Sequence, residues 1–351
     1  MSVDIQNMNG GAPVVLKAKD FATDQDVRWC PGCGDYSILK QVQTVLAELG
    51  KTPHETVFVS GIGCSSRFPY YMETYGLHSI HGRAPGFAVG LKMANPSLNV
   101  WLITGDGDGL SIGGNHLLHL FRRNFDINVI LFNNQIYGLT KGQYSPTSEE
   151  NKRTASTPYG SIDHPVNPIA FALGTDATFV ARSMDRDPKH LKEMLAKADK
   201  HRGTSFLEVY QNCNIFNDGA FFAFTEKETK PTTTLFLEHG QPLVFGKEQE
   251  IGIRLDGFTP QAVPLNDGRF TKDDLWVHDE HDQIKAQILS RFFEDPTKDP
   301  DALPRPFGIF YRTERPCYTD LLFEQIESAI AKQGEGDLDA VIAGQNTWVI
   351  G

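Results

Sequence analysis

Two short polar motifs follow apolar segments of the chain, and their residue types suit a divalent cation bound to a diphosphate. Gly105-Asp106-Gly107 comes first, and Asn133-Asn134 follows after about 25 residues. Magnesium prefers oxygen ligands in near-octahedral geometry, which the Asp106 carboxylate, the Asn134 amide and the Ile136 main-chain carbonyl can supply. The glycines let the backbone approach phosphate groups, and a helix after the motif would point its N-terminus at them. Gly-Asp-Gly alone could be an ordinary turn, so the Asn pair is what favours a cofactor site.

Cysteine positions carry a second chemical signal, because Cys30 and Cys33 form a Cys-x-x-Cys pair near the N-terminus. A thioredoxin-type pair normally follows a buried strand, whereas the stretch before Cys30 is polar. A structural zinc site normally needs a second such pair or a histidine pair, and none is near. Cys64 and Cys213 could also be small buried fillers.

A [4Fe–4S] cluster held by four thiolates is the favoured interpretation of Cys30, Cys33, Cys64 and Cys213. Cys64 and Cys213 each follow an apolar run, so both can reach the end of a strand. The fifth cysteine, Cys317, precedes a helical pattern and is interpreted as an ordinary buried thiol. An odd number of cysteines in a large chain does not favour a disulfide framework.

Alternating apolar segments must position these residues. The pattern predicts strands at 56–59, 99–103, 128–132, 178–181 and 205–210, and helices at 38–49, 86–94, around 117–121, at 189–200 and at 317–333. Strands alternating with helices predict an α/β fold with a doubly wound, mostly parallel sheet. The loops 60–66, 105–109 and 133–143 each follow a strand, so all three point to the edge where such sheets bind ligands.

Composition narrows the possible partners. The chain has 351 residues and a formal net charge of -11, which argues against nucleic acid or an anionic membrane as the main partner. No apolar run approaches the roughly 20 residues that span a bilayer, and the N-terminal MSVDIQNMNGG does not resemble a signal peptide. We therefore expect a cytoplasmic protein.

Three segments of the chain differ in composition and in their sequence patterns. Residues 1–28 are polar and read as an N-terminal arm, and residues 29–240 hold every motif described above. In residues 241–351, seven of the chain's 20 prolines fall between Pro260 and Pro316, and the alternation of strands and helices is lacking. We expect this part to be an irregular C-terminal extension that docks to a partner chain.

In combination, these motifs resemble the β subunits of the 2-oxoacid:ferredoxin oxidoreductases, and the type that acts on 2-oxoglutarate is favoured. The Gly-Asp-Gly and Asn-Asn pair is similar to the thiamine-diphosphate motif. The matching pieces span residues 29–213 and are Trp29–Asp35 (WCPGCGD), Ser60–Ser65 (SGIGCS), His81–Ala84 (HGRA), Gly105–Gly109 (GDGDG) and Ile136–Thr147 (IYGLTKGQYSPT).

The resemblance implies a reaction in which a 2-oxo acid and coenzyme A give acyl-CoA and carbon dioxide. Electrons would leave one at a time through the [4Fe–4S] cluster to ferredoxin, and the reaction could also run in reverse. Asp106, Asn134 and the carbonyl of Ile136 would hold Mg²⁺. Contacts to thiamine diphosphate are expected from Gly61, Ile62, Gly63, Cys64, Ser65, His81, Gly105, Gly107, Asp108, Gly138 and Leu139.

Three residues are candidates for contact with the substrate. His81 could act as a general acid or base or donate to the diphosphate, or it could be structural. Lys141 could bind a second substrate carboxylate, which would favour 2-oxoglutarate over pyruvate, or it could be a solvated lysine. Leu139 beside it would leave room that a larger polar residue could fill.

A partner chain follows from what this chain lacks. Thiamine enzymes of this kind need a carboxylate against the aminopyrimidine ring, and the chain contains one cofactor domain without a similar mate. We expect an α subunit that carries the pyrimidine-binding domain and its activating Glu, in a heterodimer or a dimer of heterodimers. Two alternatives stay open at this point: a non-redox thiamine-diphosphate-dependent decarboxylase or transferase subunit, and a zinc-stabilised interaction module.

Overall fold

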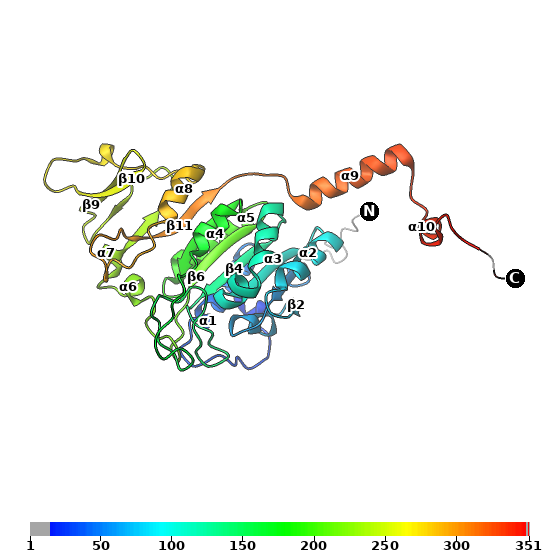
Figure 1. The fold of residues 1–351 in the computed structure, drawn as a ribbon, viewed down its shortest axis with the longest axis horizontal. Helices are drawn as coiled ribbons and strands as arrows, with labels where there is room; N and C mark the ends of the chain where they lie inside the picture. Colours follow the sequence, from blue (N-terminus) through cyan, green and yellow to red (C-terminus); the bar gives the residue numbers. More distant parts are fainter. Residues whose placement is uncertain (1–14, 349, 351) are drawn as a thin grey trace.

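A computed structural model describes residues 15–348 and 350 of the chain. Its main body is an eight-stranded sheet with the order β2-β1-β3-β4-β6-β5-β11-β7 (Figure 1). All pairings between neighbouring strands are parallel except that of β11 with β5. The strands are β1 (Thr56–Ser60), β2 (Tyr75–His78), β3 (Asn99–Gly105), β4 (Asn128–Asn133), β5 (Phe179–Met184), β6 (Ser205–Tyr210), β7 (Thr234–Leu237) and β11 (Arg305–Arg312).

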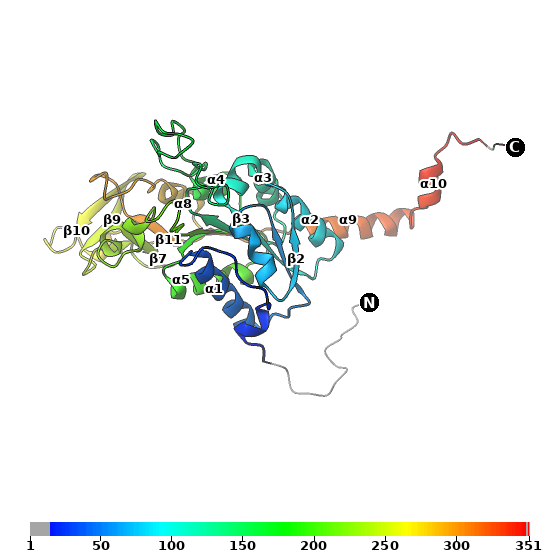
Figure 2. The same cartoon turned by 90° about the horizontal axis from the view of Figure 1, so that it is seen from below.

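Helices cover both faces of the sheet, as Figures 1 and 2 show. One face packs against α1 (Asp35–Glu48) and α5 (Pro188–Lys200), and the other packs against α2 (Ala84–Ala94), α3 (Gly114–Arg123), α4 (Pro168–Gly174) and α8 (Gln283–Ser290). Alternating residues of β3 show why both faces are covered. Val100 and Leu102 join the core under α2 and α3, whereas Trp101 and Ile103 join the core under α1. The predicted doubly wound, mostly parallel α/β fold is confirmed.

The C-terminal part differs from the predicted boundary at residue 240. β11 lies inside the main sheet between β5 and β7, and α8 packs against it and α4. Its core residues Phe307, Ile309 and Phe310 are buried, but Pro304 and Pro306 beside them hid the strand, because proline usually interrupts sheets. A separate three-stranded sheet follows β7, with β8 (Val244–Phe245), β9 (Ile251–Asp256) and β10 (Thr259–Pro264).

Short elements complete the chain. They are the 3-10 turns Ala18–Phe21, Ser65–Tyr71 and Lys272–Asp274, the π-helical turn Asp108–Ile112, and the helices α6 (Phe222–Thr225), α7 (Lys230–Thr233), α9 (Tyr318–Gln333) and α10 (Leu338–Ala343). Of the predicted N-terminal arm, residues 1–14 lie outside the described residues. α9 and α10 extend away from the body (Figures 1 and 2). In the part of the chain that the structure describes, every helix is too short or too polar to span a membrane.

Asn124 ends α3 in the left-handed conformation, with φ 54°, and is fully buried. Its Oδ1 accepts hydrogen bonds from the Thr204 backbone N–H (2.9 Å) and the Thr178 hydroxyl (2.6 Å). Its Nδ2 donates to the Arg315 carbonyl at 2.7 Å. One side chain therefore joins α3, the starts of β5 and β6, and the segment that leads to α9.

We expect Asn124→Ala to lower the free energy of unfolding by about 3 kcal/mol, because it leaves buried polar groups without partners and forces alanine into a left-handed conformation. Urea unfolding followed by tryptophan fluorescence measures the loss. Asn151→Ala is the matched control, since Asn151 is also left-handed, with φ 62°, but is exposed. Equal losses for the two variants would contradict the role of the buried hydrogen bonds.

Candidate active site

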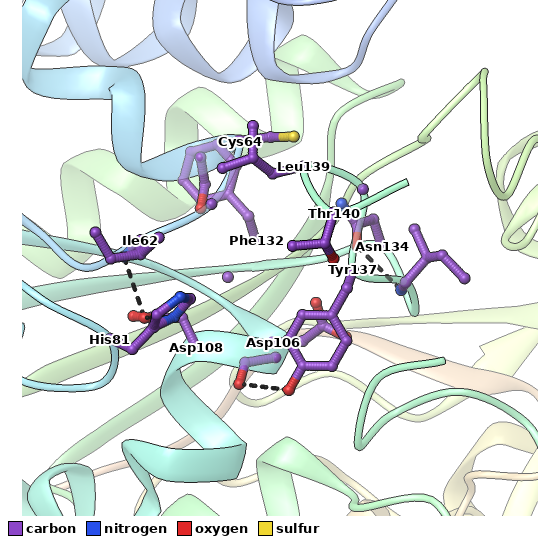
Figure 3. A pocket seen from close by; sticks show the side chains of 16 residues that line it. Ile62, Cys64, His81, Asp106, Asp108, Phe132, Asn134, Tyr137, Leu139 and Thr140 are labelled. Atoms are coloured by element: carbon purple, nitrogen blue, oxygen red, sulfur yellow. Dashed lines mark hydrogen bonds and ion pairs between the residues drawn. The ribbon is translucent and has the colours of Figure 1, made fainter. Parts of the chain in front are cut away.

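The candidate site lies where β1, β3, β4 and β6 end, at the carboxyl edge of the sheet (Figure 3). The three loops singled out in the sequence meet there, as expected for parallel strands. They enclose a cavity of about 70 Å³. Its lining consists of Ile62, Gly63, Cys64, Ser65, His81, Gly105, Asp106, Gly107, Asp108, Phe132, Asn134, Ile136, Tyr137, Gly138, Leu139 and Thr140.

Asp106 is almost fully buried, with 2% of its surface exposed. Burial raises the pKa of its carboxyl group to about 6, and hydrogen bonds from Ser145 and Thr147 oppose this rise. Ser145 Oγ lies 2.5 Å and Thr147 Oγ1 2.6 Å from Asp106 Oδ2. The two hydroxyls therefore stabilise the charged form through one oxygen. Ser145 and Thr147 were not predicted as site residues, although both lie in the Ile136–Thr147 segment of the resemblance.

The loop after β4 brings the other two oxygen donors to the cavity. Asn134 Oδ1 accepts the Ile136 N–H at 3.2 Å, and Gln135 between them is left-handed, with φ 55°. Tyr137 then donates its hydroxyl to the Gly107 carbonyl at 3.1 Å. A Cβ on Gly107 would lie only 2.2 Å from the Tyr137 ring, so only glycine allows this contact.

The donor set at this edge suits magnesium. It combines one carboxylate, one amide oxygen and one main-chain carbonyl, all on residues that line the same cavity. Within the described residues, no group of three His, Cys, Asp or Glu side chains is arranged to hold a metal ion by itself. A diphosphate would supply the further oxygens that such a set needs.

Asp108 ties two loops to the cavity. Its Oδ1 accepts the backbone N–H groups of Ile62 (3.1 Å) and Gly82 (2.9 Å), and its Oδ2 accepts the Thr104 hydroxyl. A Cβ on Gly61 would lie 1.9 Å from the same carboxylate. His81 Nδ1 lies 3.5 Å from Asp108 Oδ1, and its side chain is about half exposed. The structure thus places His81 at the mouth of the cavity (Figure 3).

Three segments that carry the four cysteines converge beside the cavity. Trp29 Nε1 donates to the Cys64 carbonyl (2.7 Å), and Asn214 Nδ2 donates to the Pro31 carbonyl (2.7 Å). Gly138 fits between two of the thiols, because a Cβ built there would lie 3.5 Å from Cys64 Sγ and 3.6 Å from Cys213 Sγ. Four thiols on three joined segments are the number and kind of donors that a [4Fe–4S] cluster uses, although no three of them lie around one metal position in the described residues.

The environment of the thiols does not suit a thioredoxin-type pair. Burial raises the pKa of Cys64 to about 12, and burial and the nearby Asp35 raise that of Cys33 further. Reactive pairs need a lowered thiol pKa. Binding of a metal would deprotonate Cys33 and Cys64, because the thiolate is the form that acts as a ligand.

Asp35 is a buried acid that the sequence analysis missed. It is 1% exposed, and neither carboxylate oxygen has a hydrogen-bond partner among the described residues. Burial, together with the charge of Asp185, raises the pKa of Asp35 to about 7. Its position two residues after Cys33 was the signal available in the sequence.

The two substrate candidates of the β4 loop are placed differently. Leu139 lines the cavity and is partly exposed, with Thr140 beside it (Figure 3). Lys141 follows at φ 75°, is exposed and does not line the cavity. The structure therefore brings Leu139 into the site and leaves Lys141 outside the lining of the cavity.

Comparisons with known proteins point to one family. Residues 61–209 match the model of the thiamine pyrophosphate enzyme, C-terminal TPP binding domain. A 2-oxoglutarate oxidoreductase subunit KorB of Mycobacterium tuberculosis is 49% identical over 349 residues, which cover 97% of this chain and 91% of that protein. A 2-oxoacid:ferredoxin oxidoreductase subunit beta of Saccharolobus solfataricus is 49% identical over 192 residues, 54% of this chain and 63% of that protein.

A solved structure agrees with these relatives. It is described as 2-oxoglutarate:ferredoxin oxidoreductase from Magnetococcus marinus with 2-oxoglutarate, coenzyme A and succinyl-CoA bound. The match has 31% identity and a TM-score of 0.74, and it covers 95% of this chain and 97% of that chain. Oxidoreductase relatives select the redox interpretation over the non-redox thiamine enzyme and the zinc module. The chain belongs to the β subunits of the 2-oxoacid:ferredoxin oxidoreductases.

Proposed function

We propose that this β subunit binds thiamine diphosphate with Mg²⁺ and one [4Fe–4S] cluster, and takes part in the CoA-dependent oxidative decarboxylation of a 2-oxo acid. The observation that carries the proposal is the segment 134–139. Asn134, Ile136 and Leu139 line the cofactor cavity, while Gly138 lies against Cys64 and Cys213. One short loop therefore touches both candidate centres, as electron transfer between them requires.

On this proposal, Asp106, Asn134 and the Ile136 carbonyl hold Mg²⁺ on the diphosphate. The backbone at Gly105 and Gly107 would approach the phosphates closely, because neither residue carries a side chain. Thiamine diphosphate, when bound, supplies the electron sink for breaking the bond to the carboxylate of the substrate. Asp108 holds the Ile62 and Gly82 backbones in place, so that His81 stays at the mouth of the cavity where substrate would enter.

Cys30, Cys33, Cys64 and Cys213 hold the cluster, which supplies a one-electron relay to ferredoxin. Cys30 is exposed and the other three thiols are half buried. The cluster would therefore lie between the cofactor cavity and the surface, within reach of a docked carrier. The reverse carboxylation uses the same residues.

2-Oxoglutarate is the favoured substrate. Relatives from M. tuberculosis and M. marinus carry that substrate in their names. Lys141 is exposed and follows Leu139 of the cavity wall by two residues, and its cation could meet the second carboxylate of a bound substrate. A monocarboxylic 2-oxo acid would gain nothing from it.

An α subunit completes the site. The residues lining the cavity include no glutamate, so the activating Glu has to come from the pyrimidine-binding domain of the partner. Apolar side chains are exposed on the segments that carry site residues: Ile80 (68%) next to His81, Ile112 (54%) at the end of the Asp108–Ile112 turn, and Ile215 (55%) two residues after Cys213. Large exposed apolar surface marks an interaction site. A heterodimer with the active site at the interface would cover it.

The projecting parts of the chain fit the same partner. The loop between β4 and α4 projects from the body (Figure 2) and exposes 95% of both Tyr159 and Ile162. α9 and α10 expose a further apolar set: Leu321, Phe323, Ile326, Ile330, Leu338, Val341 and Ile342. We infer that both regions contact partner chains.

Removing a proposed cluster ligand tests the oxidoreductase chemistry. Cys213→Ala should abolish cluster binding, so that the anaerobically prepared αβ complex loses most of its iron and the visible absorbance that bleaches on reduction. Cys317→Ala is the control, because Cys317 is buried at the start of α9, away from the other four cysteines. Full iron content in Cys213→Ala, or a colourless wild type, would contradict the proposal.

Removing the carboxylate charge tests the magnesium site. Asp106→Asn keeps the shape of the side chain but removes its charge, so the affinity for thiamine diphosphate in the presence of Mg²⁺ should fall at least tenfold, about 1.4 kcal/mol. Titration calorimetry measures the affinity. Asp163→Asn is the control, since Asp163 is exposed and bonds to Tyr144. An unchanged affinity in Asp106→Asn would show that the cation binds elsewhere.

Lys141→Ala tests the substrate preference. Loss of an exposed ion pair worth roughly 1 kcal/mol should raise KM for 2-oxoglutarate about fivefold and leave KM for pyruvate unchanged. An anaerobic dye-reduction assay of the co-expressed subunits with coenzyme A gives both values. Lys200→Ala, at the exposed end of α5, is the control. Equal effects on both substrates would argue against a carboxylate-binding role.

A further inference from the structure

Gln211 is a buried amide beside the cysteine thiols that neither the motifs nor the proposed reaction uses. It follows β6 directly and is 1% exposed. Its backbone N–H donates to the Asn133 carbonyl at 2.9 Å, which continues the pairing of β6 with β4. The sheet therefore fixes the main chain of Gln211. Its side-chain Nε2 donates a hydrogen bond to Cys33 Sγ at 3.2 Å.

The orientation of this amide is determined by its other contact. Gln211 Nε2 also lies 2.7 Å from the Asn212 carbonyl, which can only accept a hydrogen bond. The nitrogen must therefore face Asn212, and its second hydrogen is available to Cys33 Sγ. Oε1 is buried and has no partner among the described residues. An amide buried with one half unsatisfied costs stability, which calls for an explanation other than packing.

Nearby residues leave space for this arrangement. A Cβ on Gly34, next to Cys33, would lie 3.0 Å from Gln211 Cγ and 1.8 Å from Asp185 Oδ2. Glycine at this position thus lets the Gln211 side chain reach the thiol. The contact is part of the packing around Cys33. Among the described residues it is the one hydrogen bond from a side chain to a cysteine sulfur.

We propose that the hydrogen bond from Gln211 to Cys33 Sγ raises the reduction potential of the [4Fe–4S] cluster. The inference rests on the proposed function, because it requires that Cys33 ligate the cluster. Reduction adds negative charge to the cluster and its thiolates, and a donor aimed at a thiolate stabilises the more negative state. Gln211 acts through Cys33 and is thus a positioning residue. Its effect is measured as a change in the reduction potential of the cluster.

An EPR-monitored redox titration of the anaerobic αβ complex tests the proposal. Gln211→Met keeps the length of the side chain but removes the donor. At a fixed potential it should lower the ratio of reduced to oxidised cluster about tenfold, a shift of the midpoint by about 59 mV to more negative values for a one-electron couple. Gln211→Leu should shift the midpoint in the same direction.

Asn214→Leu is the matched control. Asn214 also ties the Cys213 loop to the Cys30 segment, through the Pro31 carbonyl, but it donates to no sulfur. The midpoint potential of the cluster in Asn214→Leu should stay at the wild-type value, even if the cluster is bound less firmly. A merely structural role for Gln211 would give this same behaviour, so an unchanged midpoint in Gln211→Met with its EPR signal retained overturns the proposal.

A measurement on the wild type covers the case in which the variants fail to load the cluster. Complex prepared with glutamine labelled with ¹⁵N in its side-chain amide should show a ¹⁵N hyperfine coupling to the reduced cluster. Absence of that coupling overturns the role of Gln211. Absence of iron and of any EPR signal in the wild type contradicts the proposed function instead, so the two failures are distinguishable.

Discussion

The burial of Asp106 under the carboxyl edge of the sheet is the constraint on which the site depends, because a buried carboxylate has to be stabilised by its neighbours. The stabilising groups form a chain into the core. Thr147 Oγ1 lies 2.6 Å from Asp106 and 2.9 Å from Asn133 Oδ1, and Asn133 Nδ2 donates to Glu208. Glu208 is fully buried and pairs with Arg182 at 2.7 Å.

That chain gives the site its rigidity. A buried ion pair is not by itself a strong source of stability, but breaking one partner leaves an uncompensated charge. Arg182 and Glu208 therefore hold Asn133 in one orientation, and Asn133 precedes the Asn134 that faces the cavity. β4, β5 and β6 each contribute one member, so the position of Asp106 follows from the parallel pairing of the sheet.

Much of this could be predicted from sequence, and the rest could not for physical reasons. The strands β1, β3, β4 and β6 carry apolar runs that end in unusual loops, so local patterns located the edge where the loops meet. Ser145, Thr147 and Gln211 were missed because their roles depend on contacts between segments far apart in the chain. β11 was missed because Pro304 and Pro306 masked an apolar strand whose place in the sheet is set by tertiary pairing.

The buried acids of the candidate site bear on the cofactors that we propose for it. Burial raises the pKa of Asp106 and Asp185 to about 6, of Asp35 to about 7 and of Cys64 to about 12. None of the residues lining the described cavity is a lysine or an arginine. Bound cations invert this electrostatic balance, because a metal favours the deprotonated form of each ligand. The same low-polarity surroundings that penalise the acids alone would therefore strengthen the binding of Mg²⁺ and an iron–sulfur cluster, and closure by an α subunit would strengthen it further by excluding water.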